Sequence, residues 1–242
     1  MSKNIFYAPP PAWSDDAIRL DGSETHHLRV LRLAPGAEIT VIDGEGRIAQ
    51  CRVLRMERRG ATLGIISSRL EPRGDSRAII ALALSKATRR GFFMEKAVEL
   101  GAFAIWIWQA DNSQGRMPRD FAAHIKGQLE AGAKQCGNPW LPGVRTFDDL
   151  QTLLSQTGDI DYRLLPLERQ EGQPLPDMEM LGRAGTTIYL IGPEGGFSDA
   201  EIAALLSRAF TPISLGERIL RCETAAVLCL GLHYWASQAL SR

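Results

Sequence analysis

The residues with the clearest chemical potential lie in a glycine-rich loop between an apolar run and the expected start of a helix. The run covers residues 186–191, and the loop that follows reads Gly192-Pro193-Glu194-Gly195-Gly196. Ser198 and Glu201 have the spacing of a capping box, which predicts that a helix begins there. Such loops bind ligands in α/β proteins, and glycine lets the backbone approach a ligand closely. The pattern has neither the Lys-Ser/Thr of a P-loop nor the GxGxxG order, so it disfavours a phosphate or dinucleotide site and leaves a simple tight turn as the alternative.

A second loop carries the charges that the glycine loop lacks. It covers residues 216–224, after the short apolar run at 212–215 and before an apolar helix expected at 225–240. Arg218, Arg221 and Glu223 lie within it. Two loops at neighbouring strand ends could enclose a small ligand and present charge to a second substrate. A structural ion pair between Arg221 and Glu223 near the helix start is the alternative.

The elements that must position these loops alternate between apolar strands and helices. We expect strands at 78–86, 103–111, 161–165 and 186–192, with helices at 91–100 and 118–136 between them. This alternation predicts a parallel α/β sheet. Trp106 and Trp108, at period two in one strand, favour core or interface packing over a platform for bases. Before them, three short β-like runs within residues 37–70 indicate a small all-β unit, with a domain boundary at residues 71–75.

Composition narrows the class of protein. With 242 residues, 45% hydrophobic and 23% charged, the chain is neither disordered, collagen-like nor a disulfide mini-protein. Its net charge is zero, yet residues 1–145 hold 21 basic and 15 acidic residues, and residues 146–242 hold 7 and 13. The split suggests a front part that faces a polyanion, although a random spread of solvated charges gives the same numbers.

Several other functions are disfavoured by what the sequence contains. No apolar run approaches the roughly 18 residues of a membrane span, and the first residues do not resemble a secretory signal, so we expect a cytoplasmic protein. The four cysteines form no CxxC pair, and the adjacent His26 and His27 are not completed by other ligands, so no metal site is expected.

The segments IGPEGGFSDAEI (191–202) and LGERILRCETA (215–225) together resemble the signature of the 16S ribosomal RNA uridine-N3 methyltransferase family, RsmE, in the SPOUT superfamily. HHLRVLRL (26–33), Lys86, Lys96 with 99–101, and 135–137 follow in the order that the family shows. The resemblance therefore covers nearly the whole chain.

This resemblance implies a fold, a cofactor and partners. The fold would be a PUA-like β-barrel RNA-binding domain at residues 1–72, followed by an α/β SPOUT domain with a deep trefoil knot and a parallel sheet at 73–242. The cofactor would be S-adenosyl-L-methionine, and the substrate 16S ribosomal RNA within the 30S subunit, bound by a homodimer. The cofactor residues carried over by the motifs are Leu165, Pro166, Ile191, Gly192, Pro193, Glu194, Gly195, Gly196, Leu215, Gly216, Ile219 and Leu220.

For the reaction, the resemblance points to Arg221, which would orient the uracil or stabilise its anion, and to Glu223, which would hold the arginine or assist proton loss. Arg29 and Arg32 lie three apart and, if helical, share one face, so they are the expected RNA contacts; a solvated face is the alternative. The chain departs from the family at Asn138, where relatives have Arg, and at Cys222, where they have Thr.

Two other function classes stay open. A non-catalytic RNA-binding or assembly protein could use the same fold. A nucleotide-dependent oxidoreductase would need a GxGxxG fingerprint and an acidic residue about 20 positions later, which this chain lacks.

Overall fold

The computed structural model describes residues 4–85, 87–168 and 174–240, and it divides into two compact units. The first contains Met1–Arg73 and Glu130–Leu141, and the second contains Gly74–Leu129 and Pro142–Arg242. The first unit thus takes in a segment that lies well beyond the linker region at residues 71–75.

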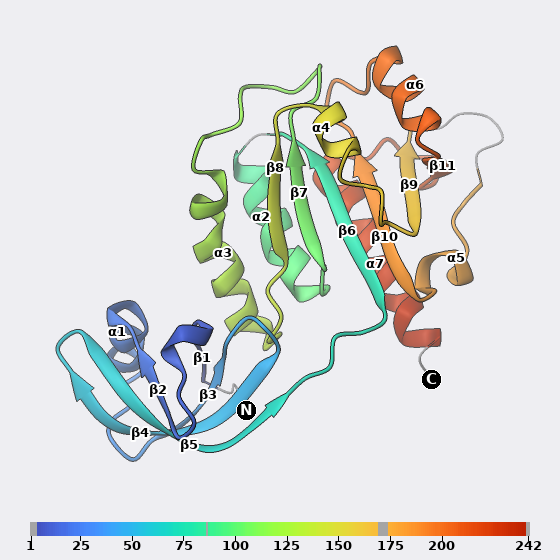
Figure 1. Cartoon of the computed structure of the whole chain (residues 1–242). Coiled ribbons are helices and arrows are strands. Elements are labelled where there is room, and N and C mark those ends of the chain that lie inside the picture. Colours follow the sequence, from blue (N-terminus) through green and yellow to red (C-terminus); the bar gives the residue numbers. More distant parts are fainter. Residues whose placement is uncertain (1–3, 86, 169–173, 241–242) are drawn as a thin grey trace. The chain divides into compact units, whose positions relative to one another are not determined.

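The first unit is built on a curled five-stranded sheet (Figure 1). The strands lie in the order β1-β3-β4-β5-β2, and all neighbours are antiparallel except β1 and β3. Phe6, Leu28, Val41 and Leu63 are among the fully buried side chains of its core. The bounds are β1 Ile5–Tyr7, β2 Ala17–Leu20, β3 Glu38–Ile42, β4 Arg47–Glu57, β5 Gly60–Leu70, a 3-10 turn at Pro10–Ala12 and helix α1 at Gly22–Val30.

Residues 130–141 are held to this sheet by a buried ion pair and by a tryptophan. Lys134 Nζ lies 2.5 Å from Glu24 Oε1, and both side chains are largely buried. The Trp140 Nε1–H donates to the Glu71 carbonyl oxygen at 3.2 Å. The Trp140 ring covers Gly46 so closely that a Cβ on this residue would lie 2.3 Å from the ring. Only glycine fits at position 46, where φ is also +99°.

The second unit is a six-stranded sheet in which every hydrogen-bonded neighbour is parallel, as the alternation of strands and helices predicts. The strand order is β11-β9-β10-β6-β7-β8. The strands are β6 Ser76–Ala83, β7 Ala104–Trp108, β8 Gly143–Phe147, β9 Tyr162–Leu167, β10 Gly185–Ile191 and β11 Thr211–Ser214. The helices are α2 Ala87–Glu99, α3 Phe121–Cys136, α4 Leu150–Leu154, α5 Met178–Gly182, α6 Asp199–Ser207 and α7 Cys222–Leu240.

The central strands of this sheet are buried on both faces, which is typical of parallel sheets. Trp106 and Trp108 are 4% and 0% exposed, so both are core residues. The Trp106 ring contacts Phe147, and the Trp108 ring stacks on Phe197 with the ring centroids 6.2 Å apart. Stacking on bases is therefore excluded for both tryptophans.

Helix α7 packs against the sheet through β6 and β10. Its buried His233 bridges those two strands: Nδ1 lies 3.1 Å from the Tyr189 hydroxyl, and Nε2 lies 3.1 Å from Ser76 Oγ. At Gly182 of α5, a Cβ would lie 2.6 Å from the α7 backbone, so a small residue is needed where the two helices meet. Among the helices described, none has the length and apolar character to cross a membrane.

Candidate functional site

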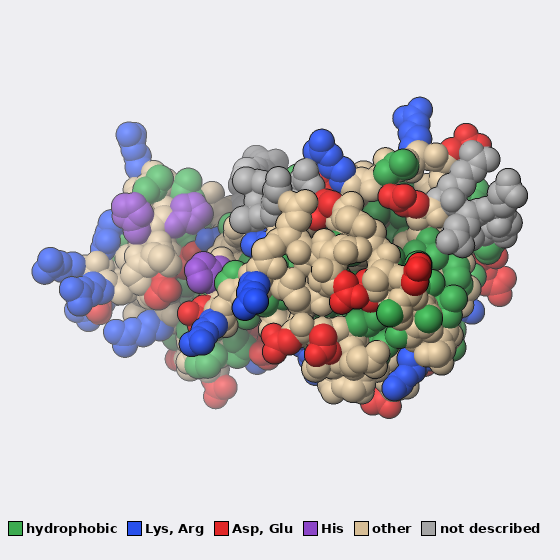
Figure 2. All heavy atoms as spheres, turned by 90° about the horizontal axis from the view of Figure 1, so that it is seen from above, with side chains coloured by type: hydrophobic (Ala, Val, Ile, Leu, Met, Phe, Trp, Pro, Cys, Tyr) green, Lys and Arg blue, Asp and Glu red, His purple; other side chains and the backbone are tan. Residues whose placement is uncertain are grey.

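A cavity of about 400 Å³ lies in the second unit, where β9, β10 and β11 end. All three strands run parallel, so the loops that follow them meet at one edge of the sheet (Figure 1). Figure 2 looks onto this edge and shows hydrophobic and acidic side chains intermixed on the second unit. Ten of the predicted cofactor residues line the cavity: Pro166, Ile191, Gly192, Pro193, Glu194, Gly196, Leu215, Gly216, Ile219 and Leu220.

Two predicted cofactor residues do not line the cavity. Leu165, a residue of β9, is 0% exposed and belongs to the hydrophobic core of the second unit. Gly195 turns toward the loop after β7, where a Cβ would lie 2.9 Å from Asn112 Cβ. Arg218, which the sequence analysis singled out for its charge, also lines the cavity. The sequence did not predict several further lining residues: Leu167, Glu168, Phe197, Ile202, Glu217, Cys222 and Ala225.

The glycine loop folds back on its own aromatic residue. A Cβ at Gly192 would lie 2.8 Å from the Phe197 ring, which is itself fixed against Trp108. Gly196 has a φ of +74°, and its N–H donates to the Pro193 carbonyl oxygen at 3.0 Å. The glycines are thus required by close approach at one position and by backbone conformation at another.

The loop after β7 holds the glycine loop from the other side. Ser198 and Glu201 form the predicted capping box at the start of α6. The buried Glu201 carboxylate also accepts a hydrogen bond from the Asp111 N–H at 2.9 Å, and Ser198 Oγ donates to Asp111 Oδ2 at 2.7 Å. The Asn112 side-chain amide donates to the Gly196 carbonyl oxygen at 3.1 Å and approaches that of Gly195 at 3.4 Å. The sequence signal for this support was a polar Asp-Asn-Ser turn directly after a buried strand.

The two predicted catalytic residues, Arg221 and Glu223, differ in solvent exposure. The Arg221 side chain is exposed and lines the cavity, whereas Glu223 is 8% exposed and lies in the first turn of α7. The ion pairs among the described residues do not include one between them. The arrangement leaves Arg221 available to a second substrate at the mouth of the cavity.

Cys222 lies between these two residues and is buried. Its thiol donates to Glu223 Oε2 at 3.3 Å. Burial, followed by the hydrogen bond to Glu223, raises the pKa of the Cys222 thiol to about 11. At neutral pH the sulfur is protonated, so it is a poor nucleophile.

The expected RNA residues Arg29 and Arg32 do not share a helix face. Helix α1 ends at Val30, and Arg32 lies beyond it with a φ of 55°. The Arg29 guanidinium donates to the carbonyl oxygens of Glu57 and Arg58, in the turn between β4 and β5. The prediction of a shared helical face is wrong because the helix stops before the second arginine.

Asn138 fixes a turn at the position where the resemblance predicts an arginine. Its side-chain Oδ1 accepts a hydrogen bond from the Trp140 N–H at 3.0 Å, which fixes the turn that seats Trp140 on Gly46. Among the described residues, no group of three or more His, Cys, Asp or Glu side chains is placed to hold a metal ion.

A parallel sheet with a glycine-lined cavity at its carboxyl edge defines the class of α/β ligand-binding enzymes. The RNA methyltransferase domain model matches residues 72–234, and the RNA methyltransferase PUA domain model matches residues 20–66. The chain belongs to this RNA methyltransferase family. The prediction that this chain is an RNA methyltransferase is thereby confirmed.

Relatives extend the similarity over most of the chain. The ribosomal RNA small subunit methyltransferase E of Mesomycoplasma hyopneumoniae is 29% identical over 85% of this chain and 88% of its own. That of Bacillus subtilis is 26% identical over 91% of each. Among solved structures, a probable rRNA-methyltransferase from Porphyromonas gingivalis is 28% identical with a TM-score of 0.86, and covers 99% of this chain and 100% of that one. The ribosomal RNA small subunit methyltransferase E from Neisseria gonorrhoeae, crystallised with S-adenosyl methionine, has the same fold: TM-score 0.84, 24% identity and 98% coverage of both chains.

Proposed function

We propose that this chain transfers a methyl group from S-adenosyl-L-methionine to N3 of a uridine in the 16S ribosomal RNA of the small subunit. The observation that carries the proposal is the exposed Arg221 at the mouth of a cavity formed by the two loops that resemble the family signature. The names of the relatives give the substrate class.

The residues of the cavity fit this cofactor. Its volume of about 400 Å³ lies within the range of small-molecule sites. Ile191, Leu215 and Leu220 supply an apolar lining for an adenine ring, and Gly192 leaves space that a Cβ would fill. When bound, the cofactor supplies an electrophilic methyl group on a sulfonium.

Arg221 and Glu223 would act on the uracil. The N3–H of neutral uracil must lose its proton before the nitrogen becomes a good nucleophile. The exposed Arg221 guanidinium at the cavity would orient the base and stabilise the anion that forms. The buried Glu223 carboxylate, at the start of α7, would hold the arginine in the loaded site or assist removal of the proton.

RNA binding by the first domain completes the proposal. We assign residues 1–72 to an RNA-binding domain, with residues 130–141 as part of the same unit, and the methyltransferase domain to the remainder of 73–242. Arg32 is exposed and is proposed as a phosphate contact, whereas Arg29 supports the adjacent turn through its carbonyl contacts. Because ribosomal RNA is the substrate, we place the protein in the cytoplasm.

The test uses labelled S-adenosyl-L-methionine and 30S subunits from a strain that lacks the gene. Label should appear in 16S ribosomal RNA, and nucleoside mass mapping should place it at uridine N3. Arg221→Ala should fold and bind the cofactor but transfer methyl groups at least about 100-fold more slowly, because an electrostatic partner of the developing charge is lost. Wild-type rates in this variant would remove Arg221 from the mechanism.

The competing function is RNA binding without catalysis on the same fold. Calorimetry with S-adenosyl-L-methionine separates the two, since a non-catalytic protein has no need of the cofactor. Heat of binding that is lost in a cavity variant such as Leu220→Asp supports the enzyme, whereas no binding to the wild-type protein supports the alternative.

We further propose a homodimer that uses the outer face of α7. Trp235 and Tyr234 on this helix are 62% and 47% exposed, and Phe92 on the adjoining α2 is 50% exposed. Exposed aromatic side chains on two packed helices are typical of a protein interface. Light scattering should give the dimer mass for the wild-type protein, and Trp235→Asp should shift it toward the monomer mass.

A further inference from the structure

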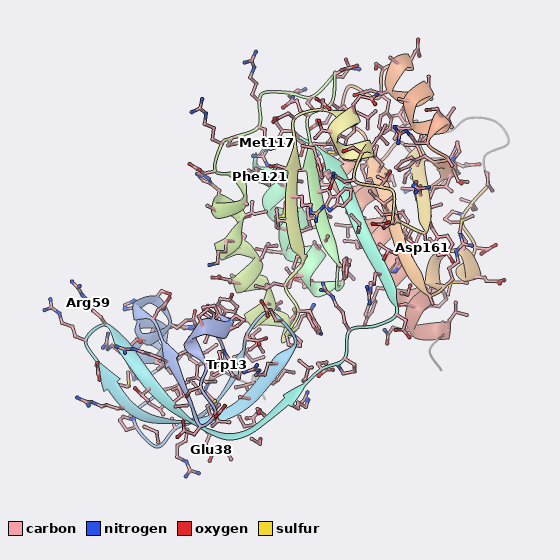
Figure 3. All side chains as sticks on the ribbon, viewed as in Figure 1. Trp13, Glu38, Arg59, Met117, Phe121 and Asp161 are labelled. Carbon is pink, nitrogen blue, oxygen red and sulfur yellow. The ribbon has the colours of Figure 1, made fainter. Side chains whose placement is uncertain are left out.

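A second groove, of about 600 Å³, lies in the first unit and is not explained by the cavity for the cofactor. It runs along the edge strand β2. Trp13 lies at the end near Ile18, with which it forms an isolated β-bridge, and Arg59 lies at the other end, where its carbonyl oxygen is near Gly22. Figure 3 labels both residues. The groove therefore has an aromatic end and a cationic end.

The lining of the groove carries arginines that form no ion pair with another described residue. Arg19 and Arg59 line the groove, Arg58 is next to it in sequence, and all three are exposed. None of the ion pairs among the described residues involves them. Figure 2 shows Lys and Arg side chains projecting from the first unit at its left. By contrast, the neighbouring Arg52 and Arg55 on β4 are paired with Glu38 at 2.7 Å and Glu57 at 3.4 Å.

One carboxylate also lines the cationic end, and its hydrogen bonds are internal. Asp21 Oδ1 accepts from the Glu24 N–H at 2.9 Å and from Ser23 Oγ at 2.8 Å, as the N-cap of α1. These bonds tie its position to the helix. On the lining itself, two arginines outnumber this single carboxylate, so that part of the groove favours an anion. Asp15 and Asp16 follow the lining residue Ser14, near the Trp13 end, so the phosphates are expected at Arg19 and Arg59 and not beside Trp13.

The aromatic end is held by two contacts of Trp13. The Arg47 guanidinium, which is not part of the groove lining, lies over the Trp13 ring with its Cζ 5.2 Å from the ring centroid. The Trp13 Nε1–H donates to the Ala8 carbonyl oxygen at 2.7 Å, which fixes the indole. Pro9, Pro11 and Ala12 line the groove beside it. Unstacked bases pack against such side chains, whereas a duplex exposes mainly its phosphates and sugars to them.

We propose that this groove binds a short single-stranded segment of RNA, with phosphates at Arg19 and Arg59 and one unstacked base on Trp13. This inference rests on the proposed function, because it assumes that the substrate is RNA. It adds a place where the enzyme holds an unpaired nucleotide away from the cofactor cavity.

Arg29 is the positioning residue of this groove. Its guanidinium donates to the carbonyl oxygens of Glu57 and Arg58, which precede Arg59 in the turn between β4 and β5. A lysine at position 29 keeps the charge but has no planar fork to hold two carbonyl oxygens. Arg29→Lys should therefore weaken RNA binding without changing the slope of log affinity against log salt concentration. If Arg29 contacted a phosphate itself, lysine would keep that contact and the affinity would stay near the wild-type value.

The test measures binding of the full chain to a fluorescein-labelled single-stranded oligoribonucleotide of about ten nucleotides, and to the duplex of the same sequence, by anisotropy over a range of salt. The wild-type protein should prefer the single strand. Arg19→Ala and Arg59→Ala should each lower the salt slope by about 0.7, and together they should weaken binding roughly ten-fold at moderate salt. Arg52→Ala is the matched control, since it removes an exposed arginine of the same sheet that Glu38 already neutralises.

Trp13 is tested by comparing two replacements. Trp13→Leu should weaken binding by between about 5-fold and 100-fold without changing the salt slope, and Trp13→Phe should recover much of the loss because a base can still stack on phenylalanine. Both variants lose the same hydrogen bond to Ala8, so their thermal unfolding serves as a common control for folding.

Any of three results would overturn the proposal that this groove binds single-stranded RNA. The double arginine variant could show the same salt slope as Arg52→Ala, or the wild-type protein could bind duplex and single strand with equal affinity. The third such result is equal RNA affinity of Trp13→Leu and Trp13→Phe. Calorimetry with S-adenosyl-L-methionine on the same proteins separates this failure from failure of the proposed function. Groove variants should bind the cofactor with wild-type affinity. If the wild-type protein did not bind the cofactor, the proposed methyltransferase activity would be refuted, while the RNA-binding measurements on the groove would still stand.

Discussion

The side-chain amide of Asn112 donates a hydrogen bond to the carbonyl oxygen of Gly196 at 3.1 Å, across 84 positions of sequence. This contact joins the loop after β7 to the loop after β10. The second of these loops lines the cavity, and the first does not. The shape of the cavity therefore depends on a residue outside it.

Replacing Asn112 should loosen the glycine loop. One hydrogen bond contributes about 1 kcal/mol, so Asn112→Ala should weaken binding of S-adenosyl-L-methionine roughly 5-fold, as measured by calorimetry. Global stability should change little, because Asn112 is exposed. Gln114→Ala, an exposed amide of the same loop, is the control and should bind normally. Equal affinity of the two variants would show that the loop holds its shape without Asn112.

Adding a methyl group at Gly192 should disrupt the cavity. The new Cβ would lie 2.8 Å from the Phe197 ring, which stacks on Trp108, so the ring or the loop must shift. Gly192→Ala should lower cofactor affinity by more than about ten-fold, because Gly192 and Phe197 both line the cavity and a displacement of either changes its shape. Gly127→Ala in α3 meets nothing within 4 Å and should be neutral or slightly stabilising. Normal cofactor binding by Gly192→Ala would contradict the assignment of this loop.

Acid should destabilise the protein through His233. Burial lowers the pKa of this imidazole from 6.5 to about 4. The unfolded chain therefore binds the proton more tightly, and the free energy of unfolding should fall as pH drops from about 6.5 to about 4, by roughly 3 kcal/mol at most. Urea unfolding at several pH values measures this slope.

His233→Gln should unfold at lower urea but with a shallower dependence on pH over that range. The exposed His26 provides the control, because His26→Gln should keep the wild-type dependence. If His233→Gln and the wild-type protein lose stability in parallel, other groups are responsible for the acid sensitivity.

Removing one partner of the buried ion pair should cost more than removing both. Lys134 Nζ lies 2.5 Å from Glu24 Oε1, whose other oxygen accepts from the Tyr7 N–H at 3.2 Å. Lys134→Met leaves a buried carboxylate without its cation and should lower the free energy of unfolding by about 3 kcal/mol. Adding Glu24→Gln should restore much of that loss. Additive effects in denaturant unfolding would show that the two side chains are not coupled.

Much of the second unit could be predicted because its strands are buried on both faces. Apolar runs marked β6, β7 and β10, and the capping box marked α6. β8 could not be found in the same way: it is an edge strand, and its exposed Arg145 and Thr146 break the apolar pattern. Edge strands are half solvated, so their sequences resemble loops.

The site was predictable to the extent that it depends on glycine and charge. Gly192 and Arg221 lie at the cavity as expected. The polar turn at Asn112 is visible in the sequence, but its partner Gly196 and the ring contact of Phe197 could not be predicted, because these contacts form only once the sheet has assembled. The prediction that Arg32 shares a helix face with Arg29 failed because the mixture of arginine with apolar residues at 28–33 suggests a longer helix. In the structure α1 ends at Val30, a few residues before Pro35.

Residues 130–141 prevent the two units from being cut apart at residues 72–73, because this segment belongs to the first unit although it follows part of the second in the sequence. A fragment that ended at residue 72 would leave Glu24 without its cation and would uncover Gly46, where Trp140 now packs. A fragment that began at residue 73 would carry Trp140 and Lys134 with nothing to bury them. A deletion, a fusion or a domain exchange made in this chain must therefore move both segments together.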